Sequence, residues 1–176
     1  MKKIIAFAGS NSKNSINHQL IEAVSQLVQN VEVEIINLRD YPAVIYGIDE
    51  EQENGYPDKI IELNEKLKEA QGYIISTPEH NGSMPAFFKN AIDWLSRIEK
   101  SVLNDLPTVF LSTSPGPRGA SSAGSHLAAI MPYRGTKVIG YHSVGSFNEK
   151  VIEGKLIEGE DKVAIEKLID ELLNEI

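Results

Sequence analysis

The chain has 176 residues, 41% of them apolar, and contains no cysteine. A chain of this length can bury a core unaided, so we expect residues 1–176 to form a single domain. The missing cysteines exclude disulfides, thiolate nucleophiles and cysteine-ligated metals, so redox chemistry would need a bound cofactor. The net charge of −8 would repel a phosphate backbone, which argues against nucleic acid as a partner.

The first apolar run, Ile4–Ala8, is too short for a signal peptide or a membrane helix. We therefore expect a cytoplasmic protein without a membrane partner. The run predicts a strand, and the turn-forming residues 9–15 end it.

Strands and helices alternate along the rest of the chain. Short apolar or alternating runs predict strands at residues 2–8, 31–35, 73–77, 108–111 and 138–140. Helical spacing of apolar residues predicts helices near residues 15–28, 60–67, 87–95, 120–131 and 165–176. Residues 38–57 are expected to be irregular, and residues 140–145 are interpreted as a strand end and a turn.

Five strands alternating with five helices predict an α/β fold whose five-stranded parallel sheet is covered on both faces. Residues 31–35 suit a sheet edge, because apolar and acidic residues alternate there. Residues 73–77 suit the sheet centre. With the strand order 2-1-3-4-5, ligands would bind between the carboxyl ends of the first and third strands.

The loop after the first strand is rich in hydrogen-bond donors. Residues 9–17 hold three serines and three asparagines directly before a helix N-terminus, where free N–H groups attract anions. Neither a Walker loop nor a GxGxxG pattern is present, so one monophosphate, as in FMN, suits the loop better than a triphosphate. A plainer alternative is that Ser15 only caps the helix.

The loop after the third strand, residues 77–85, is rigid and polar. Pro78 and Pro85 restrict its backbone, and Gly82 permits close approach. Such a loop can offer backbone groups to a flat heterocycle. The alternative is an ordinary turn that leads into a helix.

Three motifs together resemble the NADPH-dependent FMN reductase family, which includes bacterial quinone and chromate reductases. The motifs are Gly9-Ser10 with Ser15 and Asn17, residues 78–85, and residues 89–94. The likeness extends from Lys3 to about Ala123. It implies a flavodoxin-like doubly wound fold, FMN as cofactor, NADPH or NADH as electron donor, and a homodimer or homotetramer.

The resemblance also implies which residues bind the cofactor. It places five residues at the FMN phosphate: Ser10, Ser12, Ser15, Ile16 and Asn17. It places five along the isoalloxazine ring: Pro78, Glu79, His80, Asn81 and Gly82. Ser114 and Gly116 would line the other side of the ring. For Glu79 we expect the backbone to be the contact.

Three residues depart from the family pattern. Ser12 stands where many relatives have an arginine that pairs with the phosphate, so we expect either weaker FMN binding or a positive charge from Lys13 or Arg118 instead. His80 replaces a common tyrosine, and Ala86 replaces a common glycine.

The resulting hypothesis is an oxidoreductase that passes hydride from NAD(P)H through FMN to a small acceptor such as free flavin or a quinone. Orientation of the reactants would carry the catalysis, and no catalytic side chain is required. The four histidines lack HxxxH or HExxH spacing, so no metal site is expected. Two alternatives are a flavodoxin-type electron carrier and a hydrolase or nucleotide-binding regulator.

Overall fold

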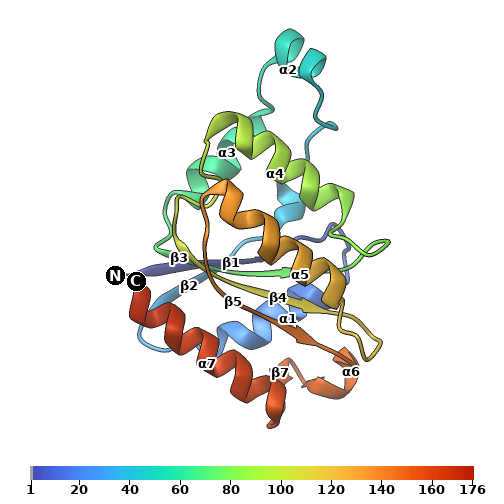
Figure 1. Ribbon diagram of the computed structural model, residues 1–176, viewed down its shortest axis with the longest axis vertical. Helices are drawn as coiled ribbons and strands as arrows, with labels where there is room; N and C mark the ends of the chain where they lie inside the picture. Colours follow the sequence, from blue (N-terminus) through green and yellow to red (C-terminus); the bar gives the residue numbers. More distant parts are fainter. Residues whose placement is uncertain (1) are drawn as a thin grey trace.

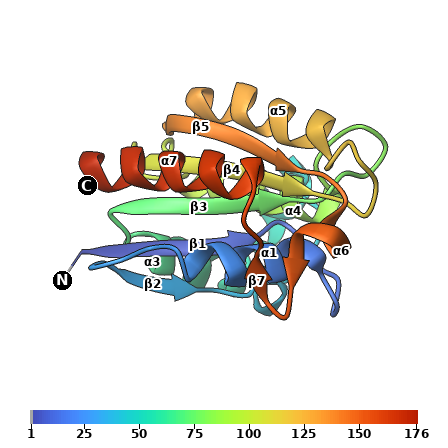
Figure 2. The ribbon, with the colours of Figure 1, turned by 90° about the horizontal axis from the view of Figure 1, so that it is seen from below.

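A computed structural model describes residues 2–176, which build a parallel five-stranded sheet between two helical layers (Figure 1). The strand order is β2-β1-β3-β4-β5, which confirms the predicted order 2-1-3-4-5. The strands are β1 (Lys3–Ala8), β2 (Glu32–Ile35), β3 (Gly72–Thr77), β4 (Pro107–Thr113) and β5 (Lys137–Val144). The carboxyl ends of all five strands meet at one edge, on the right of Figure 2.

Two layers of helices cover the sheet. One face carries α3 (Asp58–Leu67), α4 (Ala86–Ile98) and α5 (Ser121–Ile130), and the other carries α1 (Ile16–Ser25) and α7 (Glu160–Glu175). Smaller elements are η1 (Leu38–Asp40), α2 (Ile48–Asn54), η2 (Met131–Arg134), α6 (Phe147–Lys150), β6 (Val151–Ile152) and β7 (Lys155–Leu156). Across residues 2–176, no helix combines the length and apolar content that a membrane crossing requires.

The alternation of side chains along β1 divides the core into two parts. Ile4, Ala6 and Ala8 belong to the cluster under α1 and α7, whereas Ile5 and Phe7 belong to the cluster under α3, α4 and α5. All five are buried, which is why this strand is apolar throughout. The sheet is therefore held from both sides, and its carboxyl edge is a firm platform for loops.

Two predictions from the sequence were wrong in detail. Residues 38–57, expected to be irregular, contain η1 and α2; α2 buries no residue, so it has no apolar stripe to reveal it. It extends away from the sheet at the top of Figure 1. Of residues 140–145, interpreted as a strand end and a turn, residues 140–144 continue β5, whose last residue Val144 pairs with Thr113. The polar residues 141–143 concealed this strand. The hairpin β6–β7 and helix α6 were also missed.

Candidate functional site

The β1–α1 loop is pressed against its neighbours at its first residue. The Gly9 N–H donates to the Ser76 carbonyl at 2.8 Å. A Cβ atom at Gly9 would lie 2.2 Å from the Phe88 ring, so a larger residue would push the loop off α4. This contact fixes where the loop leaves the sheet.

Asn17 joins α1 to the ends of β3 and β4. Its side chain is buried, its Nδ2 donates to the Thr113 carbonyl at 3.1 Å, and its Oδ1 accepts from the Thr113 N–H at 3.1 Å and the Ser76 hydroxyl at 2.6 Å. The side-chain amide is thus committed to protein partners. Of the groups of Asn17, its backbone N–H is the one left to face an anion.

The first turn of α1 has both the cap that the plainer alternative requires and spare donors. The Ser15 hydroxyl accepts from the His18 N–H at 3.2 Å, and the Ser10 hydroxyl accepts from the Ser12 N–H at 3.2 Å. Within residues 2–176, the N–H groups of Ile16 and Asn17 donate to no protein acceptor. Unpaired first-turn N–H groups and the helix dipole attract an anion.

An open hollow of about 210 Å³ adjoins this loop. Ser10, Ser12 and Ser15 line it, and Lys13 contributes a positive charge. The hollow also contains two groups of residues that sequence reasoning did not assign to it: His18, Gln19 and Glu22 from α1, and Asn37 and Arg39 from the segment after β2. The available signal was the position of Asn37 and Arg39, which directly follow a parallel strand.

The β3–α4 loop is closed by a tight turn. His80 N–H donates to the Ser83 carbonyl at 2.8 Å, and Ser83 N–H donates to the His80 carbonyl at 3.2 Å. Asn81 and Gly82 lie between them with φ of 52° and 78°, the signature of a type I′ turn. The exposed tip, Asn81–Gly82, is therefore held in one shape.

Glu79 ties this loop to the next one. Its Oε2 accepts from the N–H groups of Ser122 at 3.1 Å and Ala123 at 3.2 Å, in the first turn of α5. The N-cap residue of α5 is Ala120, whose side chain cannot cap, so the Glu79 carboxylate supplies the missing acceptor and a negative charge. The Glu79 side chain is thus structural, and its backbone remains for a ligand.

The β4–α5 loop is in turn fastened to the start of α6. Ser114 and Gly116 carbonyls accept from the N–H groups of Phe147 at 3.2 Å and Ser146 at 2.9 Å. A Cβ atom at Gly116 would meet nothing within 4 Å, so this residue borders open space. Arg118 is directed to α5, where it donates to the Ser122 hydroxyl at 2.8 Å.

All twelve residues expected to bind the cofactor belong to three loops, which leave the carboxyl ends of β1, β3 and β4, or to the first turn of α1. Neutral donors dominate, and no cluster of three metal-binding side chains occurs among the described residues. Hydroxyls and free N–H groups suit a phosphate monoester, and the backbone groups of the two neighbouring loops suit a flat heterocycle. Fold and site together define a flavodoxin-like mononucleotide-binding protein.

Comparison with known proteins supports this class of protein. Residues 2–149 match the profile of the family described as NADPH-dependent FMN reductase, and the chain belongs to this family. This confirms the predicted class, an FMN-dependent oxidoreductase that uses NAD(P)H.

Three similar proteins illustrate the match. The NADH:(hydroxy)cinnamate reductase subunit CrdA of Vibrio ruber is 34% identical over 128 residues, which cover 72% of this chain and 61% of that protein. This chain thus spans less than two thirds of that relative. A quinone reductase of Escherichia coli is 29% identical, over 99% of this chain and 91% of that one. The solved structure of FerB, a flavoenzyme NAD(P)H:(acceptor) oxidoreductase from Paracoccus denitrificans, superposes with a TM-score of 0.79 at 24% identity, covering 99% and 97% of the two chains.

Proposed function

We propose that this chain transfers hydride from NADPH or NADH, through bound FMN, to a small acceptor such as free flavin or a quinone. Membership of the NADPH-dependent FMN reductase family supports this function. The single observation that carries it is the convergence of three interlinked polar loops at the carboxyl edge of the sheet, beside free N–H groups of α1.

In this proposal the β1–α1 loop holds the phosphate. The hydroxyls of Ser10, Ser12 and Ser15 and the N–H groups of Ile16 and Asn17 are the donors. Because Asn17 anchors α1 to β3 and β4, the donors are preorganised and little ordering entropy is lost on binding.

The two other loops hold the ring. Residues 78–82 lie on one side of the ring, and Ser114 and Gly116 lie on the other. The Glu79 carboxylate keeps the β3–α4 loop at a fixed distance from α5. FMN, when bound, supplies the hydride-accepting and hydride-donating chemistry. The residues of this chain position the reactants and leave one approach open beside the exposed Asn81 and Gly82, so catalysis rests on orientation.

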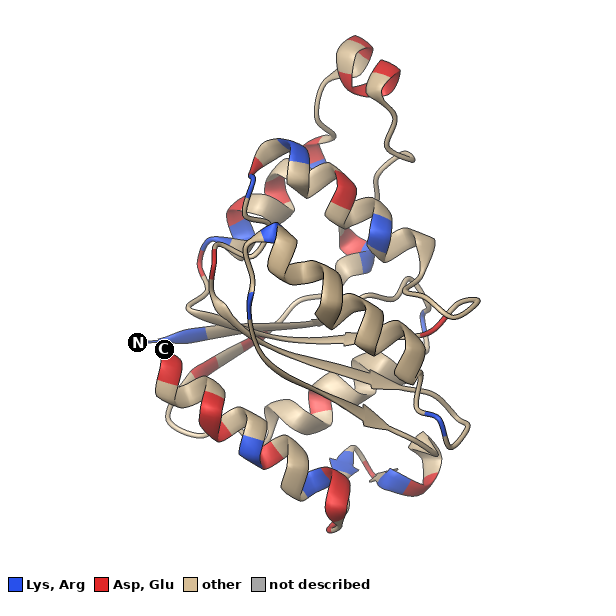
Figure 3. Ribbon diagram, viewed as in Figure 1, with Lys and Arg blue, Asp and Glu red and all other residues tan. Residues whose placement is uncertain are grey.

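The proposed partner is a second copy of the chain, in a homodimer or homotetramer. Helix α5 contains no Lys, Arg, Asp or Glu, as Figure 3 shows, and Tyr133 just beyond it is 83% exposed. A helix without these charged side chains suits the core of a subunit interface, where charged residues are depleted. A solution mass equal to one chain would contradict this part of the proposal. The single-domain organisation and the cytoplasmic location stay predictions.

An anaerobic titration of the flavin-loaded protein tests the function. NADPH or NADH should bleach the flavin absorbance, and a quinone should restore it. A flavodoxin-type carrier would hold flavin without being bleached by either nicotinamide. A hydrolase or nucleotide-binding regulator would bind phosphate compounds and no flavin.

A further inference from the structure

Arg39 lines the hollow beside the β1–α1 loop without a charged partner. It follows β2, and the Asn37 Oδ1 accepts from its backbone N–H at 3.2 Å, which fixes the start of η1. Of the other arginines, Arg97 pairs with Glu51 and Arg118 donates to Ser122. Between residues 2 and 176, no carboxylate lies within 4 Å of the Arg39 guanidinium.

The charged groups around this hollow are predominantly positive. Lys13 and Arg39 face it without an ion pair in the described part of the chain, and the Glu22 carboxylate lies 3.7 Å from His18. In a chain with a net charge of −8, two uncompensated cations beside free helix N–H groups create a local positive potential. This potential favours an anion.

We propose that Arg39, assisted by Lys13, supplies the positive charge that binds the phosphate of FMN. Ser12 on the loop carries no charge, and Arg118 is turned toward α5, so Arg39 is the guanidinium placed at this end of the loop. A guanidinium forms paired, charge-assisted hydrogen bonds with phosphate oxygens. The inference rests on the proposed function, and it makes Arg39 a residue that favours FMN over riboflavin, which lacks the phosphate.

Titration of the apoprotein with FMN and with riboflavin, followed by quenching of flavin fluorescence, tests the inference. Arg39→Gln should weaken FMN binding about tenfold to a hundredfold and leave riboflavin binding unchanged, because only FMN carries the phosphate. Lys13→Gln should weaken FMN binding severalfold, and Arg39→Lys should restore part of the loss. The salt dependence of FMN binding should be shallower in Arg39→Gln.

Arg134→Gln is the matched control, because this exposed arginine lies before the start of β5, at the opposite end of the sheet. It should leave the ratio of FMN to riboflavin affinity unchanged. The inference is overturned if Arg39→Gln keeps the wild-type ratio, or if it weakens both flavins equally, as a merely structural role would. Wild-type protein that binds neither flavin would contradict the proposed function itself, which separates the two failures.

Discussion

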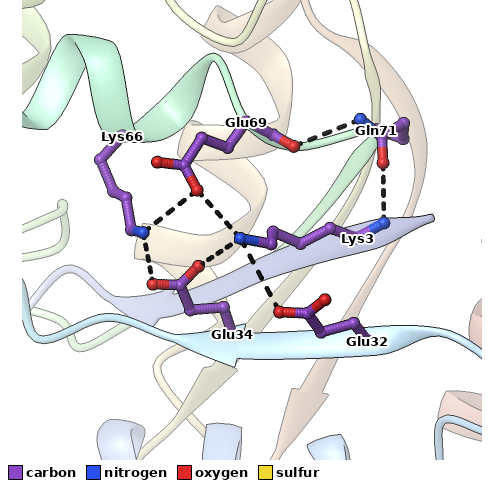
Figure 4. Close-up of polar contacts among 6 residues, drawn as sticks. All are labelled: Lys3, Glu32, Glu34, Lys66, Glu69 and Gln71. Atoms are coloured by element: carbon purple, nitrogen blue, oxygen red, sulfur yellow. Dashed lines mark hydrogen bonds and ion pairs between the residues drawn. The ribbon is translucent and has the colours of Figure 1, made fainter. Parts of the chain in front are cut away.

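The two ends of the sheet use polar residues in opposite ways. Near the amino end of β1, charged side chains satisfy one another: Lys3 lies 2.9 Å from both Glu34 and Glu69, and Lys66 lies 2.6 Å from Glu34 (Figure 4). At the carboxyl end, a few buried hydrogen bonds hold the loops. Among residues 2–176, the Ser12 hydroxyl, the N–H groups of Ile16 and Asn17, and the cations Lys13 and Arg39 have no protein partner there. The first arrangement is closed to ligands, whereas the second is available for binding.

The charged side chains near the amino end of β1 shift one another's pKa values, as closely paired groups do. The pKa of the Glu34 carboxyl lies below its usual value, because Lys66 and then Lys3 donate hydrogen bonds to it. The pKa of Lys3 is raised in return, mainly by Glu34 and Glu69. These groups lie partly in solvent, which screens their attraction. Removing the buried hydrogen bonds of one side chain at the carboxyl end should therefore destabilise the protein more than removing one of these partly exposed ion pairs.

The largest effect is expected from Asn17→Ala. The change leaves the Thr113 peptide groups and the Ser76 hydroxyl without their buried partner, which should lower the free energy of unfolding by about 3 kcal/mol. Urea unfolding measures this loss. Asn14→Ala, in the exposed part of the same loop, is the control and should change stability by less than about 0.5 kcal/mol. Similar stabilities of the two variants would show that the hydrogen bonds of Asn17 do not stabilise the fold.

Gly9→Ala should come next. The added methyl group meets the Phe88 ring, and overpacking of this kind costs about 1–3 kcal/mol. Thermal unfolding should show the loss, and FMN affinity should fall with it because the donor loop is displaced. Gly47→Ala is the matched control, since a Cβ atom there meets nothing within 4 Å. A Gly9→Ala variant as stable as Gly47→Ala would mean that the loop is not pressed against α4.

Glu79→Gln should lower stability by about 1 kcal/mol. The amide still accepts one hydrogen bond from α5, but the charge that complements the helix dipole is lost. Because the ligand contact is assigned to the backbone, riboflavin affinity should change little. Glu53→Gln, on the exposed helix α2, is the control and should leave the free energy of unfolding in urea unchanged. Strong loss of riboflavin binding without loss of stability would assign the Glu79 side chain to the ligand instead.

The smallest effect concerns pH at the amino end. A carboxyl with a depressed pKa in the folded state contributes stability above its unfolded pKa, about 4.3 for glutamate, and loses it as the pH falls through the folded value. Glu34→Gln should therefore cost about 0.5 kcal/mol at neutral pH, and the difference from wild type should shrink below about pH 4. Urea unfolding across pH 3–7 measures it. A difference that stays constant with pH would show that the ion pairs contribute nothing.

The fold could be predicted because most of its strands contain short, well-separated apolar runs, of which Ile4–Ala8 is the clearest. The expected position of the site comes from the rule that loops at the carboxyl edge bind ligands, and it stays a prediction. The roles of individual side chains could not be predicted in the same way. The hydrogen bonds of Asn17 with Thr113 and of Glu79 with Ser122 join segments that lie far apart in the chain. Arg39 was not predicted as a binding residue because it follows the edge strand β2, outside both loops that the rule selects.

A crystal structure with FMN bound would show whether the loops at the carboxyl edge of the sheet hold the cofactor. The FMN phosphate should lie at the hydroxyls of Ser10, Ser12 and Ser15, with the ring between residues 78–82 and the Ser114–Gly116 segment. Flavin bound at any other surface, with these loops still facing solvent, would contradict the assignment of the carboxyl edge as the cofactor site.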